Sequence, residues 1–161
     1  MKHLLTAQNL NMLFAASTLG YLGFGFLLEW TGLIPCPICI VIRVGLFCCL
    51  GLSLAFALIQ RHKLRQYLAG LMILMLLGTT LMAFRLWWLE TSQVPLSCGM
   101  PVSFMLLHLP LSDLIQALWM GGCQNTPTWL GLSLAGWTAI GCLGLMTLPI
   151  TLFINIKRQQ L

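Results

Sequence analysis

Charged side chains are scarce in this sequence. Only 7% of its 161 residues are Asp, Glu, Lys or Arg, whereas soluble domains carry roughly 25%. A chain with 59% hydrophobic residues and so little charge cannot cover the surface of a water-soluble domain with polar groups. The shortage excludes a soluble globular protein and indicates an integral membrane protein.

Acidic residues are the scarcest of the charged types. Three of them oppose eight Lys or Arg, for a formal net charge of +5. Most basic residues lie before the first apolar stretch, between the second and third, or after the last: Lys2, Arg61, Lys63, Arg65, Lys157 and Arg158. The other connections hold Glu29, Glu90 and Asp113. This alternation predicts cytoplasmic termini and periplasmic loops near residues 29–37 and 87–129 under the positive-inside rule. It forms no basic patch, so we expect no nucleic-acid partner.

A long soluble segment is also missing. Four apolar stretches are each long enough to cross about 30 Å of hydrocarbon as a helix, at about residues 12–28, 38–59, 67–86 and 130–154. They predict a single all-α membrane domain over residues 1–161, an up-down-up-down four-helix bundle. The cytoplasmic segments are then 1–11, 60–66 and 155–161. A cleaved signal peptide is the alternative for the first stretch, with Ala15-Ala16-Ser17 as its small-residue cleavage site, but the apolar run continues well past that site.

The second periplasmic connection has a helical pattern of its own. Apolar side chains recur at helical spacing from Leu111 to Trp119, between Pro110 and the pair Gly121-Gly122. This spacing predicts a short helix that lies in the membrane interface, with a helix packed on top of the bundle as the alternative.

Cysteine is the residue type most able to carry chemistry here. Of seven cysteines, the periplasmic connections hold Cys36, Cys39, Cys98 and Cys123, and the apolar stretches hold Cys48, Cys49 and Cys142. The latter three are expected to act as small hydrophobes. A C-x-x-C pair such as Cys36 and Cys39 is typical of a zinc site, a structural disulfide or a redox couple. We favour redox chemistry without a metal, because one pair begins a membrane helix and the compartment is oxidising.

The surroundings of Cys39 favour the redox interpretation. Pro37 suits the first position of a helix, so Cys39 is expected in the first turn, where free N–H groups and the helix dipole stabilise a thiolate. Arg43 follows four residues later on the same face. A charge at the centre of a membrane span costs about 2.5–3.5 kcal/mol or more, so Arg43 is a functional candidate, with snorkelling to the headgroups as the alternative. Arg85 is expected to be an interfacial anchor.

These features together resemble the bacterial disulfide bond formation protein B (DsbB) family over nearly the whole chain. The matching residues are Cys36-Pro-Ile-Cys39 with Arg43, Ala83-Phe84-Arg85, the loop pair Cys98 and Cys123, and Leu130-Gly131-Leu132-Ser133 with Trp137. The resemblance implies an inner-membrane thiol:quinone oxidoreductase, which reoxidises a periplasmic DsbA-like thioredoxin-fold protein and passes the electrons to ubiquinone or menaquinone.

The resemblance also implies a role for each site residue. It implies redox-active disulfides Cys36–Cys39 and Cys98–Cys123, with Cys98 attacked by the partner and Cys123 exchanging with Cys36. Cys39 and Arg43 are then the quinone-binding residues. The chain departs from the family where residues 86–97 form a short segment without histidine, and where Gly136 stands before Trp137 in place of proline. These departures leave open the third helix's share of the quinone site and whether the partner is a specialised one.

Three other functions fit parts of the pattern. A vitamin K epoxide reductase-like protein also combines a four-helix bundle, two cysteine pairs and a quinone, but its loop pair precedes its helix pair. A soft-metal transporter could use the nine Met and seven Cys, although these methionines are scattered through apolar stretches, where methionine usually fills space. A structural protein with two inert disulfides would show no thiol turnover.

Overall fold

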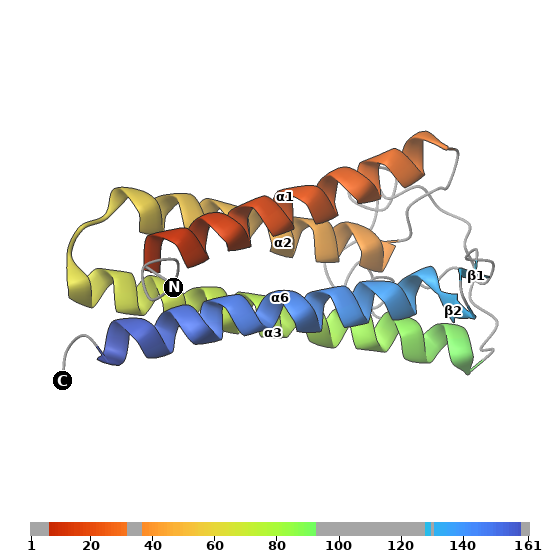
Figure 1. Cartoon of the computed structure of the whole chain (residues 1–161). Helices are drawn as coiled ribbons and strands as arrows, with labels where there is room; N and C mark the ends of the chain where they lie inside the picture. The colour runs from red at the N-terminus through yellow and green to blue at the C-terminus, as the bar shows by residue number, and fades with distance from the viewer. Residues whose placement is uncertain (1–6, 32–36, 93–127, 130, 159–161) are drawn as a thin grey trace, which may run out of the picture.

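The computed structural model describes residues 7–31, 37–92, 128–129 and 131–158 (Figure 1). Four long helices lie within them: α1 (Ala7–Trp30), α2 (Pro37–Leu58), α3 (His62–Thr91) and α6 (Leu134–Arg158). Each is long and apolar enough to cross a membrane, which confirms the predicted four-helix membrane bundle. The short interfacial helix predicted between Leu111 and Trp119 lies outside the described residues.

Three of the four helices differ in their bounds from the predicted apolar stretches. α1 and α3 extend beyond their stretches at both ends, because a helix continues through polar residues once it has formed. α6 begins only at Leu134, since the residues before it form a small antiparallel pair of strands, β1 (Thr128–Trp129) and β2 (Leu132–Ser133). Gly131 turns the chain between them at φ 80°, a backbone conformation that favours glycine. The Ser133 hydroxyl oxygen then caps α6 by accepting the Gly136 N–H at 3.2 Å.

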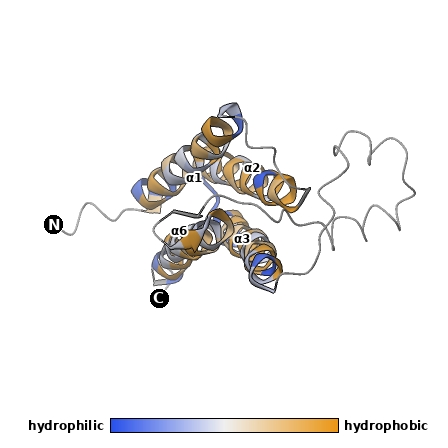
Figure 2. Cartoon of the chain, turned by 90° about the vertical axis from the view of Figure 1, so that its right-hand side faces the viewer, coloured by the Kyte–Doolittle hydropathy of each residue, from blue (hydrophilic) through white to orange (hydrophobic). Residues whose placement is uncertain are grey.

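The four helices pack as antiparallel neighbours. Seen from the end, they follow one another around the bundle in the order α1, α2, α3, α6 (Figure 2), and each packs against the next, with α6 closing the ring onto α1. Buried apolar side chains such as Phe14, Leu46 and Leu76 fill the centre. Large apolar side chains such as Leu54 and Leu81 also stand exposed on the outside. Apolar residues both inside and outside are what a helix bundle in lipid requires.

α2 and α3 approach each other closely at Gly45. A Cβ atom at this position would overlap the Thr79 methyl group. Small residues let membrane helices pack backbone to backbone, which gains van der Waals contact that lipid cannot replace. The Thr79 hydroxyl meanwhile donates to the Leu76 carbonyl of its own helix at 2.8 Å, so the close contact leaves no polar group there without a partner.

Charge divides the two ends of the bundle. The start of α1, the turn between α2 and α3 and the end of α6 lie at one end (Figure 1), which carries Arg61, Lys63 and Lys157. Glu29 and Glu90 lie near the opposite end, where α1 and α3 finish and α2 begins. The cysteine chemistry predicted at the start of α2 therefore belongs to the acidic end.

Candidate functional site

The site begins with Cys39 at the acidic end of the bundle. α2 starts at Pro37, so Cys39 lies in the first helical turn, as the sequence predicted. Its half-buried side chain packs against the central core cluster. The N–H groups and the positive dipole end of a first helical turn favour an anion on sulfur. The other three predicted redox cysteines, Cys36, Cys98 and Cys123, lie outside the described residues, so their positions relative to Cys39 stay a prediction.

Arg43 lies one helical turn below Cys39 and reaches across to α1. Its Nη1 donates to Glu29 Oε2 at 2.6 Å, and its Nη2 donates to the Gly25 carbonyl oxygen at 2.8 Å. The Arg43 Cζ atom also lies 4.9 Å from the centroid of the Phe26 ring, within the range of a cation–π contact. With 19% of its side chain exposed, Arg43 is a largely buried cation that three α1 residues hold in place.

No pattern in the sequence indicates this contact between helices. Glu29 was identified only as one acid of a periplasmic connection, and it lies 14 residues before Arg43. Gly25 supplies a backbone carbonyl, which any residue carries. A Cβ atom at Gly25 would lie 3.5 Å from Arg43 Nε, so the guanidinium rests directly against the helix backbone. Helical periodicity can place Arg43 on a face of α2 but cannot identify what that face meets.

A tyrosine on α1 forms a second polar contact close to Cys39. Tyr21 lies near enough to Cys39 to interact with it electrostatically, and its hydroxyl is hydrogen bonded to the Thr138 side chain on α6. The Thr138 hydroxyl also donates to the Leu134 carbonyl of its own helix at 2.8 Å. The ring lies over Gly141, where a Cβ atom would come within 2.7 Å of it. One tyrosine in an apolar stretch offers no pattern by which it could have been predicted.

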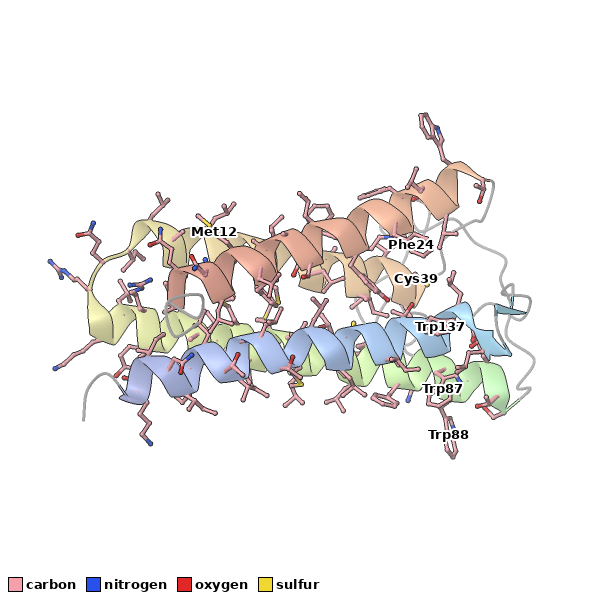
Figure 3. The ribbon with its side chains drawn as sticks, in the orientation of Figure 1. Met12, Phe24, Cys39, Trp87, Trp88 and Trp137 are labelled. Carbon is pink, nitrogen blue, oxygen red and sulfur yellow. The ribbon has the colours of Figure 1, made fainter. Side chains whose placement is uncertain are left out.

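Aromatic side chains surround this end of the bundle. Figure 3 shows Phe24 from α1, Trp87 from α3 and Trp137 from α6 at the same end as Cys39. Trp88 points away from the bundle and is 73% exposed, as expected of a tryptophan at the membrane interface. An apolar, aromatic neighbourhood that includes the largely buried Arg43 fits a quinone, whose ring is flat and apolar and whose oxygens accept hydrogen bonds.

The cysteines inside the spans have simpler surroundings. Cys49 and Cys142 are buried and Cys48 is exposed on the outside of α2, and all three are free thiols. Within the described part of the chain, no group of three or more His, Cys, Asp or Glu side chains could hold a metal ion. The structure therefore assigns no chemistry to these three cysteines.

Comparison with known proteins identifies the family. The sequence profile described as "Disulfide bond formation protein DsbB" matches residues 7–152. Proteins named disulfide bond formation protein B are similar over most of their length. The one from Aromatoleum aromaticum is 34% identical over 147 residues, covering 86% of this chain and 87% of that protein. The one from Marinobacter nauticus is 35% identical over 152 residues, covering 88% and 87%. No solved structure gives a significant match. The chain thus belongs to the DsbB family of disulfide bond formation proteins.

Proposed function

We propose that this chain is an inner-membrane thiol:quinone oxidoreductase that reoxidises a periplasmic DsbA-like dithiol protein and passes the electrons to a membrane quinone. Membership of the DsbB family supports this function over a metal transporter or a vitamin K epoxide reductase-like enzyme. The observation that carries it is the position of Cys39 in the first turn of a membrane-spanning helix, one turn from the largely buried Arg43.

The proposed function requires the acidic end of the bundle to face the periplasm. Arg61, Lys63 and Lys157 at the opposite end support this orientation, because basic residues are enriched in cytoplasmic connections. The termini then lie in the cytoplasm, and Cys39 lies at the periplasmic end of the bundle, facing a compartment in which disulfides persist.

The proposed electron path consists of thiol–disulfide exchanges. A thiolate of the partner attacks Cys98, which breaks the Cys98–Cys123 disulfide and releases Cys123 as a thiolate. The second partner thiol attacks the mixed disulfide, so the partner leaves oxidised and Cys98 is reduced. Cys123 then attacks Cys36 and releases Cys39, and Cys98 resolves the Cys123–Cys36 bond. The loop pair is oxidised again, and two electrons and two protons rest on Cys36 and Cys39.

Residues of α2 favour the attack of Cys123 on Cys36. Cys39 is the leaving group when Cys36 is attacked, and the helix N-terminus and Arg43 both stabilise the thiolate that results. A bound quinone would accept two electrons and two protons and so return the pair to a disulfide. Arg43 would hold one of its oxygens through a charge-assisted hydrogen bond, and Cys39 would face its ring.

Reoxidation of a reduced DsbA-like protein by the purified chain, with and without ubiquinone or menaquinone, tests this function. Cys98→Ser should abolish oxidation of the partner, because the first disulfide is lost.

Arg43→Ala should keep partner binding but raise the apparent KM for quinone by roughly tenfold or more, since a hydrogen bond to a charged group contributes about 1.5–3 kcal/mol. Arg43→Lys should be intermediate, because it keeps the charge without the planar fork.

Cys48→Ser is the matched control, since Cys48 is a free thiol on the outside of the same helix. It should behave as the unmodified chain. No quinone-dependent oxidation of the partner by the unmodified chain would contradict the proposed function. An unchanged KM and turnover in Arg43→Ala would place the quinone away from Arg43.

A further inference from the structure

Glu29 has no part in the proposed electron path, yet it contacts the cation on which that path depends. Its Oε2 atom lies 2.6 Å from Arg43 Nη1. The Glu29 side chain is 41% exposed and that of Arg43 is 19% exposed, so the pair lies where water screens it only partly. The Gly25 carbonyl and the Phe26 ring complete the set of α1 groups around the guanidinium. A negative charge this close to Arg43 changes how strongly its positive charge stabilises nearby anions.

We propose that Glu29 is a positioning residue that holds the Arg43 guanidinium toward α1 and offsets its charge. It thereby sets how strongly Arg43 stabilises an anion at Cys39 or on the electron acceptor. This inference rests on the proposed redox function, because it assumes that Arg43 acts on those groups.

The direction of the effect follows from the geometry. Arg43 alone would present a full positive charge one helical turn from Cys39, about 6 Å along the axis. Paired with Glu29, it presents a dipole whose negative end lies on α1, and the field of a dipole falls off faster with distance than that of a single charge. Removing the Glu29 charge should therefore increase the fraction of Cys39 present as thiolate, whereas removing Arg43 should decrease it.

The competing explanation is that the pair merely ties α1 to α2. Under that explanation, breaking the contact from either side disturbs the same structure, so changes at Glu29 and Arg43 act in the same direction. The positioning role predicts opposite directions. Glu29→Gln distinguishes the structural explanation from the positioning role, because the amide oxygen can still accept the Arg43 Nη1–H while the charge is lost.

Other ionisable groups near Cys39 must stay constant in such a test. Tyr21 on α1 and Cys142 on α6 interact electrostatically with one another, and Tyr21 also with Cys39. α3 contributes Arg85 and Glu90 near the same end of the bundle. None of these four residues is changed in the variants below, so they contribute equally to every comparison.

The first measurement is the alkylation rate of Cys39 by iodoacetamide at neutral pH, quantified on the Cys39 peptide. It is made in a full-length chain that carries Cys36→Ser, Cys98→Ser and Cys123→Ser, so that Cys39 is reduced. Because the thiolate is the reacting form, Glu29→Gln should raise the rate by roughly three- to tenfold and Arg43→Ala should lower it. Glu29→Asp keeps the charge and should restore the rate to within about twofold of the parent.

Thr31→Ala is the control, since Thr31 is exposed at the end of α1 and its hydroxyl donates only to the Leu28 carbonyl at 2.6 Å. It should leave the rate unchanged. A slower or unchanged rate in Glu29→Gln would overturn the proposal, because neither a tether nor an inert surface pair makes Cys39 more reactive when the Glu29 charge is removed. Circular dichroism of each variant verifies that the helices are retained, and Glu29→Asp keeps the test decisive if Arg43→Ala does not fold.

The second measurement is the apparent KM for quinone of the chain with all its cysteines present. Glu29→Gln should lower this KM by about three- to tenfold, in the direction opposite to Arg43→Ala. If the unmodified chain does not oxidise the partner with quinone, the proposed function fails, whatever the alkylation rates are. If it does and Glu29→Gln leaves both the KM and the alkylation rate unchanged, only the role of Glu29 fails.

Discussion

Polar contacts join α1 to α2 at both ends of the bundle, and the two contacts differ in almost every property. At the basic end, Asn11 Nδ2 donates to the Ser53 carbonyl at 3.0 Å and the Ser53 hydroxyl donates to Asn11 Oδ1 at 2.9 Å. These two side chains are neutral, and only 3% and 1% exposed. At the acidic end, Arg43 and Glu29 are charged, and 19% and 41% of their side chains are exposed.

The difference indicates what each contact contributes. A buried polar group left without a partner costs about 1–3 kcal/mol, so Asn11 and Ser53 stabilise this arrangement of α1 and α2 against alternatives that separate them. A partly exposed ion pair contributes only about 0–1 kcal/mol to stability. Its charges nonetheless act on neighbouring groups over several ångströms. The Asn11–Ser53 contact, called the inner contact below, is suited to holding the helices together. The Arg43–Glu29 contact, called the outer contact, is suited to changing the electrostatics of a nearby site.

The largest expected effect is on stability at the inner contact. Asn11→Ala should lower the free energy of unfolding by about 1–3 kcal/mol, because it leaves the buried Ser53 hydroxyl without its amide partner. Unfolding in increasing mole fractions of SDS, followed by tryptophan fluorescence, measures this. Thr147→Ala is the control, since Thr147 is exposed and its hydroxyl donates only to Gly144 of its own helix. Equal losses of unfolding free energy in Asn11→Ala and Thr147→Ala would mean that the Asn11–Ser53 contact contributes no more to stability than an exposed hydroxyl does.

A smaller effect separates the contacts by their coupling energies. A double-mutant cycle on Asn11→Ala and Ser53→Ala should give a coupling of about 0.6 kcal/mol and at most about 1.7 kcal/mol in unfolding free energy, the average and the maximum for hydrogen bonds between membrane helices. The equivalent cycle on Glu29→Gln and Arg43→Met should give about 0.5 kcal/mol or less. Should the outer pair show the larger coupling, its main role would be structural.

The smallest expected effect concerns salt. Raising NaCl from about 0.05 to 0.5 M shortens the Debye length to a few ångströms. The difference in Cys39 alkylation rate between Glu29→Gln and its parent should then shrink by about twofold or less, because the pair is only partly exposed. The loss of stability in Asn11→Ala should not change, since neither group there is charged. If salt changed the stability loss in Asn11→Ala but not the alkylation difference at Glu29, the contrast between a neutral inner contact and a charged outer contact would be wrong.

Local sequence pattern predicted the helices and the start of α2 but not what joins them. Apolar length identified four spans, and Pro37 predicted correctly that Cys39 lies in a first turn. The Arg43–Glu29 and Asn11–Ser53 contacts depend on how α1 and α2 are rotated about their axes, which packing of the whole bundle decides. The late start of α6 was missed for a different reason. The leucines and Gly131 before it are compatible with a helix, and only pairing of β1 with β2 selects the turn.

The close contact at Gly45 also has a mechanical consequence. At that level, two residues below Arg43, α2 lies against Thr79 with no room for a methyl group, so rotation or sliding of α2 past α3 there requires Thr79 or the helices to shift. The part of α2 above this point extends only from Pro37, about two helical turns. In the proposed thiol exchange, the Cys39 sulfur can move by rotation of its own side chain or by bending within those two turns, without disturbing the Gly45–Thr79 contact. The Gly45–Thr79 contact thus holds α2 against α3, and only the first two turns of α2, which carry Cys39, lie beyond it.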